Sequence, residues 1–233
     1  MAKEFENSCP VPAGILIVIG GAESKGKEPE NHEAPDGYNP LEILKCFTDL
    51  LPPKDAAIKV ITSASADGEV LIRQYKKVFK KLGVENIHHI HHHTRKEVLA
   101  DNDLEQHVKE ADGFFFTGGD QLLLTSLYGG TPFLTMLKEK YISKKIVIAG
   151  TSAGAMALST PMIYSGSKEK EQLTNEIKVT TGLEFLKDVC IDTHFVHRGR
   201  LVRLAQVVAT NPTTIGIGID EVLKQLDKQR SQG

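Results

Sequence analysis

The feature that most constrains the fold is a repeated alternation of short apolar runs with longer segments of helical periodicity. Most of the runs are apolar at nearly every position, which is typical of strands covered on both faces. They lie at 14–21, 56–65, 85–90, 113–120, 144–152 and 214–220. Between them, segments such as 68–83 carry apolar residues at helical spacing. This alternation predicts an α/β fold in which a mainly parallel sheet is sandwiched by helices.

Length and composition narrow the class of protein. The chain has 233 residues, of which 40% are hydrophobic and 25% are charged, and its formal net charge is −2. We expect a single domain over 1–233, with 1–12 and 221–233 peripheral. The small net charge does not indicate a nucleic-acid partner, and no apolar run is long enough to predict a membrane span. The three cysteines have no paired spacing and the first residues show no signal-peptide pattern, so we expect a cytoplasmic protein.

One of the apolar runs leads into a serine flanked by very small residues. Residues 150–154 read G-T-S-A-G and fit the G-x-S-x-G pattern of a nucleophile elbow, a tight strand-to-helix turn that needs small neighbours. Two other predicted strands end in IGGAE (19–23) and FTGGDQ (116–121). Because open α/β sheets bind ligands at the carboxyl ends of their strands, we predict that Ser152 is a nucleophile in a site formed by these ends.

A serine nucleophile needs a base, which is usually a histidine. Five of the nine histidines fall within 88–93. We interpret that run as a solvated strand or loop and not as a metal site, because no cysteine or carboxylate supports it. His194 is different, because it ends an apolar strand beside Asp192 and is followed by Arg198, Arg200 and Arg203. These arginines either hold an acidic substrate next to the base or form an exposed basic helix face.

The segment after the first predicted strand also matches most of a phosphate-binding loop. Residues 21–27 fit G-x₄-G-K, but the next residue is Glu28, so no hydroxyl is available for Mg²⁺. We therefore interpret GGAE as a turn that brings the backbone close to the active site.

Taken together, the motifs resemble those of the cyanophycinases, in the serine peptidase family that also holds aspartyl dipeptidase E. The motifs are IGGAE, TSAS, FFFTGGDQ, GTSAGAMALS, DTHFVHRGRLVRLAQ and NPTTIGIGID, and they span roughly residues 11–220 in the family's order. The resemblance implies a fold like that of class I glutamine amidotransferases, with serine in place of their cysteine, and a homodimer. It also implies that the substrate is cyanophycin, a poly-aspartate chain with arginine on each side-chain carboxyl, which is cut to β-Asp-Arg dipeptides without a metal or cofactor.

The resemblance also implies roles for individual residues. It makes Ser152 the nucleophile and His194 the base, with oxyanion donors at the backbone N–H of Ala153 and at Gly119 or its neighbour Gly118. The residues implied to line the substrate pocket are Gln121, Asp192, Arg198, Arg200 and Arg203.

The acid of the triad is the least defined of these roles. The family takes it from the segment just after the nucleophile helix, which favours Glu169, with Glu171 next, but another register places Lys170 there. After residue 220 the family continues into further β structure, whereas this chain ends in a charged segment. Two alternatives therefore stay open, namely a peptidase acting on short aspartyl peptides and a non-catalytic relative.

Overall fold

The computed structural model describes residues 11–25, 41–165 and 177–221, and its main element is a parallel sheet of five strands. In the order β1-β5-β4-β2-β3 all neighbouring strands run parallel. The strands are β1 (Ile15–Ile19), β2 (Ala57–Ile61), β3 (Asn86–Ile90), β4 (Gly113–Phe116) and β5 (Val147–Thr151). Five of the six predicted strands are thus confirmed as members of one parallel sheet.

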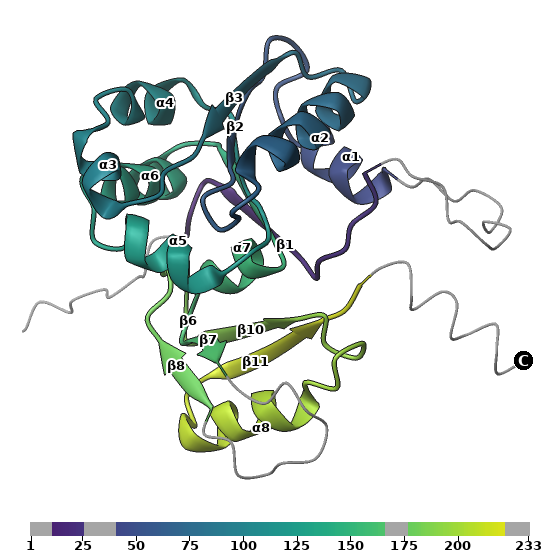
Figure 1. Cartoon of the computed structure of the whole chain (residues 1–233), viewed down its shortest axis with the longest axis vertical. Helices are drawn as coiled ribbons and strands as arrows, with labels where there is room; N and C mark the ends of the chain where they lie inside the picture. The colour runs from purple at the N-terminus through teal and green to yellow at the C-terminus, as the bar shows by residue number, and fades with distance from the viewer. Residues whose placement is uncertain (1–10, 26–40, 166–176, 222–233) are drawn as a thin grey trace, which may run out of the picture.

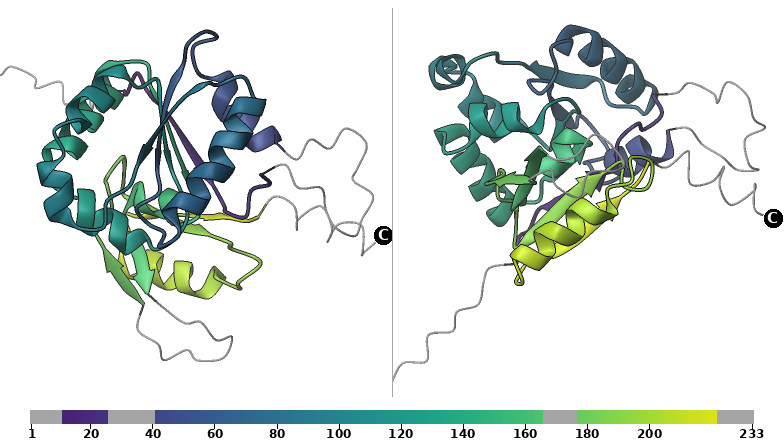
Figure 2. Two further views of the ribbon diagram at one scale, coloured as in Figure 1. Left: turned by 45° about the horizontal axis from the view of Figure 1, so that its top comes forward. Right: turned by 60° about the horizontal axis from the view of Figure 1, so that its bottom comes forward.

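Helices cover both faces of this sheet (Figures 1 and 2). Helices α1 (Glu42–Asp49) and α2 (Gly68–Lys81) lie on one face; α3 (Arg95–Ala100), α4 (Leu104–Glu110), α5 (Gln121–Tyr128) and α6 (Pro132–Ser143) lie on the other. Because successive strand residues point to opposite faces, the aromatic side chains of β4 pack against the helices on both sides of the sheet. Phe115 packs against Phe47 and Phe79, whereas Phe114 packs against Phe133. The predicted helix–sheet–helix arrangement is confirmed.

A second, four-stranded sheet lies beside the first and has the order β11-β10-β6-β9 (Figure 1). Its strands are β6 (Ser159–Thr160), β9 (Leu186–Lys187), β10 (Val189–Thr193) and β11 (Ile215–Ile219), with α8 (Leu201–Thr210) packed on β10 and β11. Strands β7 (Met162–Ser165) and β8 (Lys178–Thr180) form a separate pair. Helix α7 (Ala153–Ala157) contacts both larger sheets, and all five of its residues are buried.

The strand at 214–220 does not have two covered faces. Strand β11 is an edge strand of the second sheet, and its Ile215 and Ile217 are 64% and 37% exposed. Its glycines face the other way: a Cβ at Gly216 would lie 2.9 Å from Val208 of α8, and one at Gly218 would lie 2.5 Å from the Phe195 ring. An apolar run alone does not distinguish a strand with one covered face from a strand with two.

The arrangement of the two sheets fixes where a site can form. The end of β5 leads directly into α7, and β10 and β11 run parallel in the second sheet.

No helix in the described ranges is long and apolar enough to cross a membrane.

Candidate active site

Ser152 lies on a strained turn between β5 and α7. Its backbone has φ 51° and ψ −116°, a left-handed conformation that non-glycine residues rarely adopt, and its N–H donates to the carbonyl of Ile19 at 3.0 Å. The small neighbours are required by close backbone contacts. A Cβ at Gly154 would lie 2.2 Å from the carbonyl oxygen of Phe116, and one at Gly150 would lie 2.6 Å from the backbone of Gly154. The turn therefore has the geometry of a nucleophile elbow.

The side chains of Ser152 and His194 meet across the boundary between the two sheets. The Oγ of Ser152 lies 2.8 Å from Nε2 of His194, which is the residue that follows β10. On the other side of the ring, Nδ1 lies 2.5 Å from Oε1 of Glu221. The side chains of His194 and Glu221 are each only 8% exposed. If Nδ1 carries the proton and donates to Glu221, Nε2 is left to accept the proton of Ser152.

Glu221 is the residue that the sequence analysis missed. It is buried and contacts the histidine, although 221–233 was expected to be peripheral. The residues favoured earlier, Glu169 and Glu171, lie outside the described residues, as does Lys170. The parallel pairing of Thr193 with Ile219 explains why Glu221 comes near His194, since both residues follow the carboxyl ends of neighbouring strands.

The surroundings of His194 favour a neutral imidazole. Burial is the main cause that lowers its pKa below the ordinary value, and the positive charges of Arg198 and Arg200 act in the same direction. The hydrogen bond and the charge of Glu221 oppose this shift. A neutral imidazole at neutral pH is the form that can accept the serine proton.

Backbone N–H groups at the start of α7 and in the Gly118–Gly119 pair are available to an oxyanion. Ala153 begins α7, and a Cβ at Gly118 would lie 3.4 Å from the Cβ of Ser152. Within the described ranges, neither the N–H of Ala153 nor that of Gly118 donates a hydrogen bond. The N–H of Gly119 donates no hydrogen bond in these ranges either, and a Cβ at Gly119 would lie 2.1 Å from the carbonyl oxygen of Ala64. Both glycines considered from the sequence therefore stay candidate donors.

The turn after β1 completes this arrangement, as GGAE predicted. A Cβ at Gly21 would lie 2.5 Å from the His194 ring and 3.0 Å from the Cβ of Ser152. The carbonyl of Gly20 accepts from the N–H of His194 at 3.0 Å. The expectation that this stretch brings backbone close to the site is confirmed.

The comparison with known families agrees with this geometry. Residues 16–224 match the family model named peptidase family S51. This chain belongs to peptidase family S51. The family resemblance stated from the motifs is thereby confirmed.

Relatives of this S51 chain include proteins named cyanophycinase. The one from Synechococcus elongatus is 34% identical over 208 residues, which are 89% of this chain and 61% of that protein. The one from Nostoc sp. (strain PCC 7120) is 31% identical over 221 residues, which are 94% of this chain and 70% of that protein. This chain therefore spans 61% of the length of the Synechococcus relative.

The solved structure of a peptidase has the same fold. The crystal structure of a peptidase from an acI-B1 Actinobacterium matches with a TM-score of 0.62 and 24% sequence identity, covering 91% of this chain and 82% of that one. The central parallel sheet with flanking helices is thus the class I glutamine amidotransferase-like fold of S51 peptidases, as predicted.

Two of the predicted pocket arginines are held inside the protein by Asp192. Its carboxylate is fully buried and accepts from Arg200 Nη1 at 3.1 Å, from Arg203 Nε at 2.5 Å and from Arg203 Nη2. Burial is the main cause that lowers the pKa of Arg200 to about 10. The carboxylate of Asp192 thus has two guanidinium partners within the protein.

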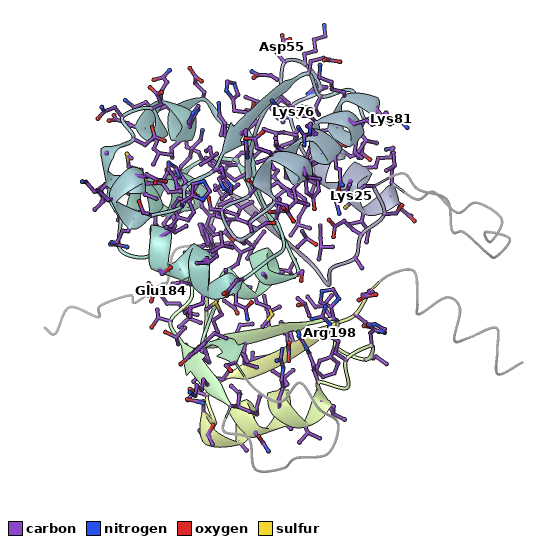
Figure 3. The ribbon with its side chains drawn as sticks, viewed as in Figure 1. Lys25, Asp55, Lys76, Lys81, Glu184 and Arg198 are labelled. Carbon is purple, nitrogen blue, oxygen red and sulfur yellow. The ribbon has the colours of Figure 1, made fainter. Side chains whose placement is uncertain are left out.

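The two other predicted pocket residues are more open to solvent. Arg198 is exposed and lies beyond β10, on the side of the second sheet, whereas Lys25 lies on the side of the first (Figure 3). Gln121 is half-buried at the start of α5, and its amide donates to the carbonyl of Ile163 at 2.8 Å.

The histidine run is less solvated than expected. His92 is buried and contacts the Tyr128 hydroxyl and Asp101, both at 3.0 Å. His89 and His91 both contact the hydroxyl of Thr62, at 2.7 Å and 2.8 Å. Among the described residues no group of three or more histidine, cysteine or acidic side chains is arranged to hold a metal ion.

Proposed function

We propose that this chain is a serine peptidase that hydrolyses cyanophycin to β-Asp-Arg dipeptides. The observation that carries the proposal is the series of contacts from Ser152 through His194 to Glu221, at 2.8 Å and 2.5 Å, on a strained elbow. A hydroxyl, an imidazole and a carboxylate in this order form the constellation that activates serine in hydrolases.

The first step is attack of Ser152 Oγ on a backbone carbonyl carbon of the aspartate chain. His194 Nε2 takes the hydroxyl proton as the new C–O bond forms. Glu221 holds Nδ1–H in place and stabilises the imidazolium that results. The negative charge on the carbonyl oxygen is stabilised by the N–H group of Ala153 and by that of Gly119 or Gly118.

The second half of the reaction reverses the proton transfers. His194 gives its proton to the departing amine, which breaks the C–N bond and leaves an acyl-enzyme on Ser152. A water molecule, deprotonated by His194, then attacks the ester and releases the product. None of these steps requires a metal or cofactor.

Arg198 is the side chain best suited to hold this substrate. Each arginine of cyanophycin is attached through its α-amino group, so its α-carboxylate remains free along the polymer. An exposed guanidinium beside the base can bind such a carboxylate through two parallel hydrogen bonds. Arg200 and Arg203 then support this surface from within through their contacts with Asp192.

Hydrolysis of short aspartyl peptides is the second candidate, because the same nucleophile and the same exposed arginine would serve it. Insoluble cyanophycin and a short aspartyl peptide are incubated separately with the protein, and clearing and product masses are followed. We expect clearing with release of β-Asp-Arg. Product from the short peptide alone would favour the second candidate.

The matched control is a pair of serine variants. Ser152→Ala should lower the rate by at least about 10³-fold. Ser126→Ala, which changes an exposed serine on α5, should not lower it. A Ser152→Ala rate within about tenfold of the wild-type rate would refute the serine mechanism, given the losses typical of such sites. The homodimer and the cytoplasmic location stay predictions.

A further inference from the structure

A second buried carboxylate, Glu23, lies beside the nucleophile strand and takes no part in the steps above. It is 7% exposed. Its carboxylate accepts hydrogen bonds from Thr151 Oγ1 and from the Tyr75 hydroxyl, and the ammonium group of Lys25 lies 3.4 Å away. A carboxylate is costly to bury unless it is paired and hydrogen-bonded, so these contacts account for its burial.

The contacts of Glu23 join the two segments that carry the reacting groups. Thr151 directly precedes Ser152 at the end of β5. Glu23 belongs to the 20–23 turn, in which the Gly20 carbonyl holds the backbone of His194 and Gly21 lies against its ring. The hydrogen bond from Thr151 to Glu23 therefore ties the serine side of the site to the turn that holds the histidine.

The other partners of Glu23 keep this connection in place. Burial, followed by the charge of Glu23, raises the pKa of Tyr75 well above its ordinary value, so the phenol remains a donor. The ammonium of Lys25 lies 5.0 Å from the centroid of the Tyr75 ring, a cation–π distance. Glu23 is thus held by helix α2 as well as by β5.

We propose that Glu23 is a positioning residue that sets the Ser152–His194 distance by fixing the 20–23 turn to the end of β5. The inference rests on the proposed function, in that Ser152 is taken as the nucleophile. Ser152 and His194 come from different sheets, so their 2.8 Å contact depends on the segments that join those sheets. Misplacing a reacting group by about 1 Å can cost about 10²-fold in rate.

The test removes the hydrogen bond between Thr151 and Glu23 by changing Thr151, and a second variant of Thr151 keeps it. Thr151→Val has nearly the same shape but no hydroxyl, and Thr151→Ser keeps the hydroxyl. Glu23→Gln removes the charge at the other end. Thr131→Val is the matched control, because Thr131 is also a buried threonine with hydroxyl contacts, but it caps α6 away from the site.

Two rates are measured for each variant, both per folded protein as judged by thermal unfolding. One is the rate at which a fluorophosphonate labels Ser152. The other is kcat on whichever substrate the wild type hydrolyses, cyanophycin or a short aspartyl peptide, and KM for that substrate is determined with it. We expect Thr151→Val and Glu23→Gln to lower the labelling rate and kcat by about 10- to 100-fold with KM changed less than about twofold. Thr151→Ser should be close to the wild type, and Thr131→Val should lose stability without losing either rate.

The outcomes separate this inference from the proposed substrate. Wild-type labelling rates in both Thr151→Val and Glu23→Gln would overturn the positioning role, as would an equal loss in Thr131→Val. If the wild type labels at Ser152 but hydrolyses neither cyanophycin nor short peptides, the substrate proposal fails, and the labelling rates still decide the role of Glu23. A wild type that is not labelled at Ser152 would overturn both.

Discussion

Replacing Glu221 by glutamine should remove most of the activity while preserving the shape of the site. The carboxylate accepts from Nδ1 of His194 at 2.5 Å, and both side chains are largely buried. Glutamine has the same length but no charge. It therefore leaves the imidazolium that forms during attack without a counter-charge.

The size of the loss follows from the geometry. Two unit charges about 4 Å apart attract by about 4 kcal/mol at an effective dielectric constant of about 20. Since about 1.4 kcal/mol corresponds to a factor of ten in rate, losing this attraction costs about 10³-fold. If the new amide donates to Nδ1, the ring holds its proton on Nε2 and can no longer accept from Ser152, which brings the loss to about 10⁴-fold.

The assay measures kcat of Glu221→Gln on whichever substrate the wild type hydrolyses, cyanophycin or a short aspartyl peptide. Glu169→Gln and Glu171→Gln are the matched controls. We expect the large loss at Glu221 alone. The residual activity of Glu221→Gln should also extend to lower pH, because Glu221 raises the pKa of His194 against the effect of burial. A Glu221→Gln enzyme within about tenfold of the wild type, together with a large loss in Glu169→Gln, would refute the assignment of Glu221.

Three further predictions concern charge and burial. Asp192→Asn should lower the free energy of unfolding by about 2–3 kcal/mol in urea titrations, because it leaves Arg200 and Arg203 without their buried carboxylate; unchanged stability would contradict this. Arg198→Met should raise the pKa of His194, so the acid limb of kcat/KM should move to higher pH, and a limb that stays in place would contradict the electrostatic account. The urea midpoint should be lower at pH 5 than at pH 7, because burial is the main cause that lowers the pKa of five described histidines and the unfolded chain therefore binds more protons below about pH 6.5. These are His88, His89, His91, His107 and His194, and a midpoint that rises on acidification would contradict the prediction.

Much of the fold could be predicted because strand and helix signals are local. Mostly apolar runs marked the strands of the parallel sheet, and apolar residues at helical spacing marked 68–83 as a helix, where α2 spans Gly68–Lys81. The second sheet could not be predicted in the same way, because the run at 214–220 looks the same whether one face or both are covered. Burial of β11 depends on which strand it pairs with, and pairing is a long-range property.

The candidate site was predictable where its geometry is local. Ser152 and its small neighbours form one turn, and His194 ends an apolar strand, so both could be proposed from short stretches. Glu221 could not be reached by searching near the serine, because its place depends on the parallel pairing of β10 with β11. A search over every strand end would have included it, since it lies two residues beyond Ile219.

The division of the reacting groups between two sheets has a consequence for how heat inactivates the protein. Ser152 follows the large sheet, which is covered on both faces, whereas His194 and Glu221 follow strands of a smaller sheet whose helix α8 buries only Leu204 and Val207. Regions with few buried apolar contacts open at lower free energy than the core does. On heating, activity should therefore disappear at a lower temperature than the circular-dichroism signal of the helices that cover the large sheet. The loss of activity would then report local opening of the smaller sheet before the core unfolds.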